Sequence, residues 1–126
     1  MSRMLIVEDD ALVLRTIKRR IESSITDVVI DTATNLDEAQ GLISKNHYDI
    51  VSTDGQFPTT KNDRVNSGEF NGNIVISLAK QKKSFVVVLT GNAQDLHGYD
   101  EAFTKSPDDT SLYLQAIEKY LKEHHG

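Results

Sequence analysis

Four apolar segments of this sequence each lead into side chains that could take part in phosphoryl chemistry. In chain order these side chains are Glu8 and Asp9, then Asp54, Thr90 and Lys105. A cluster of carboxylates is costly unless a cation is bound, and Mg²⁺ prefers such hard oxygen ligands. A carboxylate can also act as a nucleophile and form an acyl phosphate. The set therefore suits the making and breaking of an aspartyl phosphate.

Each of these residues has an expected role in that reaction. Asp54 would attack the phosphorus, while Glu8 and Asp9 would hold Mg²⁺. Lys105 would pair with the phosphoryl group, and Thr90 would donate a hydrogen bond to it. The roles require that residues far apart in the chain meet at one place.

Alternating strand and helix patterns supply such a meeting point. The expected strands are Met4–Val7, Val28–Asp31, Asp49–Thr53, Phe85–Leu89 and a weak one at Glu101–Thr104. The expected helices are Ala11–Ser23, one from Asn35 to about Lys45, Asn73–Lys82, and one from Pro107 to about Lys122. Repeated strand–helix units predict a parallel sheet with right-handed crossovers, and ligands bind such sheets at the carboxyl ends of the strands. All five candidate residues fall at those ends.

Local signals mark the starts of two helices. Asn35 can cap the second helix, with Glu38 three residues on as its capping-box partner. Ser106, Pro107 and two acids predict the start of the last helix. In the third helix, Ile74 and Leu78 are expected to face inward, with Ile76 and Ala79 as further candidates.

Two connections are unusual in length. Residues 58–72 are polar and rich in Gly and Asn, which predicts a long loop, and long loops in compact domains are usually functional or mobile. Residues 91–100 show little apolar periodicity. Fifteen positions separate Thr90 from Lys105. That is too few for a full helix, a turn and a strand, so the fourth helix is expected to be short or absent.

Composition bounds the function classes. A length of 126 residues predicts a single domain over 1–126. The net charge of -5 argues against nucleic acid as a direct partner, and the lack of cysteine excludes disulfides and thiolate metal sites. The sequence contains neither a signal-peptide pattern nor an apolar run of membrane-spanning length. We therefore expect a cytoplasmic domain with no membrane partner.

The chain resembles the receiver domain of two-component response regulators over essentially its full length. The matching motifs are Leu5–Asp9, Asp49–Asp54, Pro58, Val88–Thr90 and Phe103–Lys105. The resemblance implies a flavodoxin-like (βα)5 three-layer sandwich with sheet order 2-1-3-4-5. It also implies phosphotransfer from a histidine kinase or histidine phosphotransfer protein to Asp54, and a protein-binding surface that switches for a downstream protein. The main-chain carbonyl of Gln56 would join the Mg²⁺ ligands. Such a domain is not an enzyme beyond its own phosphotransfer and dephosphorylation.

The sequence departs from the receiver pattern in four places. The loop after Pro58 is about ten residues longer than usual, and the fourth helix lacks room. Ala102 stands where receivers carry a switch aromatic, so Phe103 or Tyr99 is a candidate substitute. Ser106 separates Lys105 from the proline that usually follows it in a cis peptide, and Pro107 is better explained as a trans residue in the first helical turn.

Other functions on the same fold stay open. A pseudo-receiver would keep the fold as a protein-interaction module without being phosphorylated. A phosphohydrolase would use Asp54 but expects an acid two residues later, where Gln56 stands. Flavin or dinucleotide binding expects a phosphate-cradling loop after the first strand, and the acids at 8–10 would repel an uncompensated phosphate.

Overall fold

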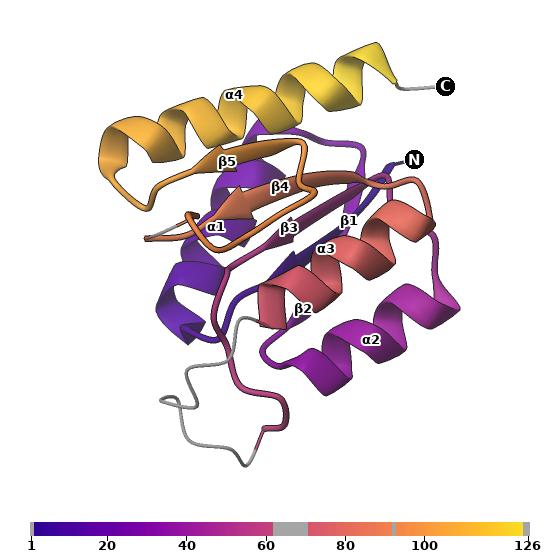
Figure 1. The fold of residues 1–126 in the computed structure, drawn as a ribbon. Coiled ribbons are helices and arrows are strands. Elements are labelled where there is room, and N and C mark those ends of the chain that lie inside the picture. The colour runs from indigo at the N-terminus through magenta and orange to yellow at the C-terminus, as the bar shows by residue number, and fades with distance from the viewer. Residues whose placement is uncertain (1, 62–70, 92, 125–126) are drawn as a thin grey trace.

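The computed structural model describes residues 2–61, 71–91 and 93–124, in which strands and helices alternate (Figure 1). In chain order the elements are β1 (Ser2–Val7), α1 (Ala11–Ser24), β2 (Val28–Ala33), α2 (Leu36–Lys45), β3 (Ile50–Thr53), α3 (Asn71–Gln81), β4 (Phe85–Leu89), β5 (Glu101–Phe103) and α4 (Pro107–Glu123). None of these helices is both long and apolar enough to cross a membrane.

The five strands form one parallel sheet in the order β2-β1-β3-β4-β5, as the sequence predicted. Helices α2 and α3 cover one face, and α1 and α4 cover the other (Figure 1). Side chains alternate between the two layers along each central strand. In β1, Leu5 and Val7 join the core under α2 and α3, whereas Met4 and Ile6 join the core under α1 and α4. Burial on both faces explains why these strands are continuous apolar runs.

The crossover from β4 to β5 contains no helix among residues 91 and 93–100, which confirms the expected loss of the fourth helix. Leu96 is buried, and the side chains of Ala93 and Tyr99 pack against the same core. This segment therefore covers the sheet with a few side chains in place of a helix.

Helix caps match the sequence signals. Asn35 accepts a hydrogen bond from the amide of Glu38, and Ser106 accepts one from the amide of Asp109. Asp10, beside the acidic pair, caps α1 by accepting from the amides of Leu12 and Val13. The described residues contain no cis peptide, consistent with a trans Pro107 in the first turn of α4.

Two expectations for α3 were wrong. The helix begins at Asn71, so the loop expected at 58–72 ends two residues earlier, and residues 62–70 of it lie outside the described chain. Ile74, which was expected to face inward, is 42% exposed. Leu78 packs against the core, and Ile76 and Ala79 are buried as expected, together with Asn71, Gly72 and Val75. This rotation of the helix brings Gly72 against the end of β3, where its amide donates to the carbonyl of Gly55.

Candidate functional site

The three predicted acids meet at the carboxyl ends of β1 and β3. Glu8, Asp9 and Asp54 each present a carboxylate oxygen within 4.8 Å of the others. Glu8 and Asp54 are buried, with 3% and 9% of their surfaces exposed, and Asp9 is half-buried. The amide of Asp54 donates to the carbonyl of Val7, which ties the ends of the two strands together. Three carboxylates so close to one another form a donor set that fits a hard divalent cation.

Lys105 connects two of these acids. Its ammonium lies 3.0 Å and 3.2 Å from the two carboxylate oxygens of Glu8 and 2.9 Å from Oδ2 of Asp54. The other oxygen of Asp54 accepts a hydrogen bond from the amide of Gly55 at 2.6 Å. Asp54 is thus oriented by a charged group on one side and by its own strand end on the other.

The cluster shifts the acid–base equilibria of its members. Burial, and then the charge of Asp54, raise the pKa of Glu8 to about 8. Burial and the same neighbour raise the pKa of Asp9. Burial disfavours the charged form of Lys105, but its hydrogen bond to Asp54 and the two negative neighbours outweigh burial, and its pKa is raised. Without a cation, the cluster thus disfavours ionisation of Glu8 and Asp9, and a bound divalent cation would favour their charged forms.

Thr90 lies close to Gly55, the residue that follows Asp54. It is buried at the end of β4, and its amide donates to the carbonyl of Phe103 in β5. A Cβ built on Gly55 would lie 3.3 Å from the Thr90 hydroxyl and 3.0 Å from Cδ1 of Leu96. The residue after Asp54 is therefore enclosed by Thr90 and by the segment that replaces the fourth helix.

Main-chain carbonyls after Asp54 are almost all engaged. The carbonyl of Gly55 accepts from the amide of Gly72, and that of Phe57 accepts from the Asn71 side chain. The carbonyls of residues 58 and 59 accept from the first two amides of α2. Within the described residues, the Gln56 carbonyl alone in this run, 55–59, accepts no hydrogen bond. It is therefore available to an incoming ligand.

Asn71 and Gly72 are structural residues of the site that sequence reasoning missed, because it placed them in the loop. The side chain of Asn71 donates to Phe57 at 2.8 Å and to the hydroxyl of Thr59 at 3.2 Å. A Cβ built on Gly72 would lie 2.6 Å from the carbonyl oxygen of Asp54. The available signal was a glycine two residues before the apolar run Ile74–Ile76.

A buried hydrogen bond supports β3, the strand that leads to Asp54, from the α1–α4 layer. The hydroxyl groups of Ser52 and Tyr113 lie 2.6 Å apart, and Tyr113 is fully buried in α4. The ring of Phe103 packs edge-on against Tyr113, at 6.1 Å between centroids. Phe103 thus faces the α1–α4 layer, whereas Tyr99, the other candidate for the missing aromatic, packs in the α2–α3 layer with Leu96.

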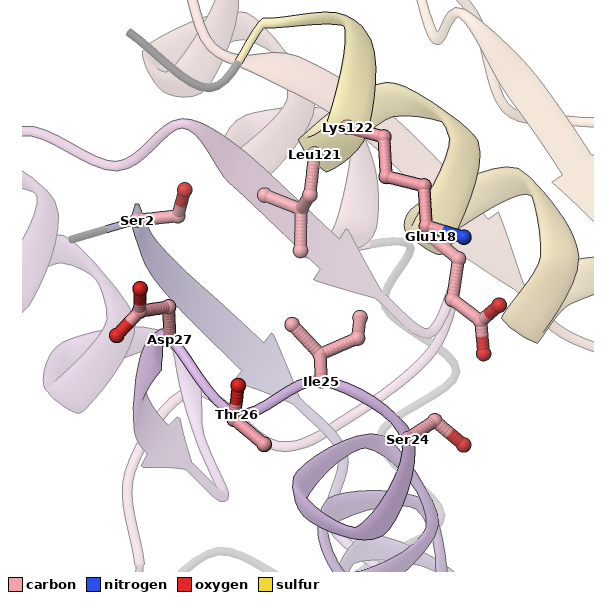
Figure 2. A pocket seen from close by; sticks show the side chains of 8 residues that line it. All are labelled: Ser2, Ser24, Ile25, Thr26, Asp27, Glu118, Leu121 and Lys122. Atoms are coloured by element: carbon pink, nitrogen blue, oxygen red, sulfur yellow. The ribbon is translucent and has the colours of Figure 1, made fainter.

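A cavity of about 320 Å³ lies at the opposite end of the sheet, between the α1–β2 connection and the end of α4. Figure 2 shows Ile25 and Leu121 pointing toward each other across it, with Ser2 and Asp27 at its side. None of the predicted site residues lines this cavity. The candidate chemistry is therefore that of the acidic cluster and not of this cavity.

No family model and no curated protein sequence matches this chain. Solved structures do match. The response regulator protein TrrA from Thermotoga maritima, solved in complex with Mg²⁺ and BeF, is 26% identical, with a TM-score of 0.75 over 96% of this chain and 100% of that one. A two-component response regulator from Clostridium difficile is 19% identical, with a TM-score of 0.75 over 100% of both chains. A Burkholderia pseudomallei response regulator, with a phosphorylated aspartic acid and a calcium ion, is 18% identical, with a TM-score of 0.67 over 98% of this chain and 74% of that one.

The chain thus has the fold of response regulator receiver domains over nearly its whole length. The acidic cluster of Glu8, Asp9 and Asp54 is consistent with a phosphorylation site on that fold.

Proposed function

We propose that this chain is a phosphoacceptor module of a two-component or phosphorelay system, phosphorylated on Asp54 in a Mg²⁺-dependent reaction. The donor would be a phosphohistidine of a histidine kinase or a histidine phosphotransfer protein. The observation that carries the proposal is the joint position of Asp54, two further acids and Lys105 at the carboxyl ends of β1 and β3.

The residues divide the reaction between them. A carboxylate oxygen of Asp54 attacks the phosphorus, an oxygen–phosphorus bond forms, and the nitrogen–phosphorus bond of the donor breaks, which leaves the electron pair on the histidine. Lys105, already within 2.9 Å of Asp54, moves its charge to the incoming phosphoryl oxygens. The buried hydroxyl of Thr90 donates to the same group.

Mg²⁺ fits this donor set. Glu8, Asp9, Asp54 and the free carbonyl of Gln56 would hold it, and when bound it would supply positive charge to the phosphoryl oxygens. The raised pKa of Glu8 agrees with this role, because a carboxyl that resists ionisation alone becomes a good ligand when a cation compensates its charge.

We propose that the switching surface is the segment between β4 and β5; the other candidate, the connection at 58–72, falls partly outside the described residues. Leu96 packs on Gly55, and the side chain of Asn73 in α3 holds the residues on either side of Leu96: it donates to the carbonyl of Asp95 at 2.9 Å and accepts from the amide of His97 at 3.0 Å. A phosphoryl group on Asp54 would draw Thr90 toward it. Because Thr90 and Leu96 both lie close to Gly55, the packing of Leu96 against Gly55 would then change. This segment then presents a different surface to a downstream protein.

The test is the intact mass of the protein after incubation with a small-molecule phosphodonor and Mg²⁺. We expect one added phosphoryl group, absent in Asp54→Asn and in the presence of a chelator. Asp9→Asn should weaken Mg²⁺ binding, whereas the matched control Asp10→Asn should not, because residue 10 is a helix cap and Asn caps equally well.

A failure to form the adduct with both the small donor and a histidine phosphotransfer protein, while Mg²⁺ still binds, would reject the phosphoacceptor function. That result would favour a pseudo-receiver, which keeps the fold and the metal site as a protein-interaction module. Turnover of a generic phosphate ester would instead indicate a phosphohydrolase.

A further inference from the structure

Lys105 lies in a short connection between β5 and α4 that packing does not hold. Residues 104–107 are all exposed. Yet the Lys105 side chain must bridge Glu8 and Asp54, which lie 97 and 51 positions away in the chain. Lysine has a long side chain with high rotamer entropy. The position of its ammonium group is therefore defined only if the main chain on both sides of Lys105 is fixed.

Polar contacts to one helical residue fix that main chain. The amide of Thr104, before the lysine, donates to Oδ2 of Asp109 at 2.8 Å. The hydroxyl of Ser106, after the lysine, accepts from the amide of Asp109 at 3.2 Å. The hydroxyl of Thr104 also donates to the hydroxyl of Ser106 at 3.0 Å, so the residues before and after Lys105 are bonded to each other as well. Both neighbours of Lys105 are therefore bonded to the same residue of α4.

The neighbouring acid does not share this contact. Asp108 also lies in the first turn of α4, so it interacts with the helix dipole much as Asp109 does. Within the described residues it makes no hydrogen bond to the 104–106 connection. Hydrogen bonds from Thr104 lower the pKa of Asp109, whose carboxylate therefore stays ionised at neutral pH. The connection thus depends on one acid of the pair.

We propose that Asp109 is a positioning residue for Lys105: its carboxylate holds the amide of Thr104, and this hydrogen bond fixes the point from which the ammonium reaches Asp54. The contact with Ser106 comes from the main-chain amide of Asp109 and stays when the side chain is replaced. Asp109 touches neither the phosphoryl group nor the metal. The inference about Lys105 placement stands on the geometry alone, and its effect on phosphoryl binding rests on the proposed function.

The first measurement follows the Lys105 ammonium by NMR in metal-free protein with ¹⁵N-labelled lysine, assigned with Lys105→Arg. A hydrogen-bonded ammonium exchanges its protons slowly with water. We expect Asp109→Ala to accelerate this exchange roughly three- to tenfold, the range that the loss of one hydrogen bond gives. Asp109→Asn, which keeps an acceptor oxygen, should restore most of the protection, and Asp108→Ala should leave it unchanged.

The second measurement compares Mg²⁺ binding with the binding of beryllofluoride, a phosphoryl mimic, in the presence of Mg²⁺. Asp109→Ala should weaken beryllofluoride by roughly three- to tenfold and leave the Mg²⁺ affinity unchanged, because Lys105 is expected to contact the phosphoryl group and not the metal. Circular dichroism of each variant confirms that α4 is folded.

Several results would overturn the inference. Unchanged ammonium exchange in Asp109→Ala, an equal loss in Asp108→Ala, or no rescue by Asp109→Asn would each show that this hydrogen bond does not place Lys105. If beryllofluoride fails to bind the unsubstituted protein, the proposed function fails, while the ammonium measurement still decides the role of Asp109.

Discussion

Replacing Gly72 by alanine should push the first turn of α3 away from Asp54. A Cβ at this position would lie 2.6 Å from the carbonyl oxygen of Asp54 and 2.9 Å from both Cα and the carbonyl oxygen of Gly55. All three are main-chain atoms, which cannot rotate out of the way. Either α3 shifts, and its hydrogen bond from Gly72 to Gly55 breaks, or the end of β3 shifts with it.

The magnitude follows from three contributions. Overpacking of a closely packed site costs about 1–3 kcal/mol. Loss of the hydrogen bond to Gly55 costs about 1 kcal/mol. Alanine has a higher helix propensity than glycine, which stabilises the folded state by about 1 kcal/mol. We therefore expect Gly72→Ala to lower the free energy of unfolding by about 1–3 kcal/mol.

Gly41→Ala in α2 is the matched control, because a Cβ there meets no atom within 4 Å. The free energy of unfolding of Gly41→Ala should rise by about 0.5–1 kcal/mol from helix propensity alone. Urea unfolding monitored by circular dichroism measures both variants, with equal m-values as the check that the denatured states are comparable. If Gly72→Ala is as stable as Gly41→Ala, the close approach of α3 to β3 is wrong.

Three further predictions concern the site and its supports. Burial and the charge of Asp54 raise the folded-state pKa of Glu8 from 4.5 to about 8, so its stabilising contribution is full below pH 4.5 and is lost as the pH rises through about 8. The urea concentration at the unfolding midpoint, measured with a chelator present, should fall as the pH rises through that window. Mg²⁺ should reduce this fall, and Glu8→Gln should make the midpoint nearly independent of pH there. Tyr113→Phe should cost about 1–2 kcal/mol, because it leaves the Ser52 hydroxyl buried without its partner, and the penalty should shrink in the Ser52→Ala background. Asn73→Ala should speed amide hydrogen exchange at His97 and leave α2 unchanged; equal exchange in both proteins would show that Asn73 does not hold the segment.

Sequence reasoning succeeded where local signals or strand ends determine the outcome. The sheet order follows from alternating strands and helices, and the meeting of Glu8, Asp9 and Asp54 follows from the parallel direction of β1 and β3. The absence of the fourth helix followed from the short distance between Thr90 and Lys105.

It failed where the outcome depends on main-chain contacts between distant segments. Ile74, Val75 and Ile76 are consecutive apolar residues, so periodicity allows more than one rotation of α3, and the observed rotation is the one that brings Gly72 against Gly55. The hold of Asp109 on Thr104 was likewise invisible, because the same residue already had an explanation as a first-turn acid. The metal role of the Gln56 carbonyl stays a prediction.

The long connection after β3 is closed at its base. Thr59 is bound to the start of α2, Asn71 begins α3, and the side chain of Asn71 reaches the hydroxyl of Thr59 at 3.2 Å. When the two ends of a connection are held this way, the number of residues between them has little influence on the rest of the protein, since doubling a loop costs only about 0.6 kcal/mol in closure entropy. We therefore expect that an epitope inserted between residues 61 and 71 leaves the hydrogen bond between Asn71 and Thr59 in place.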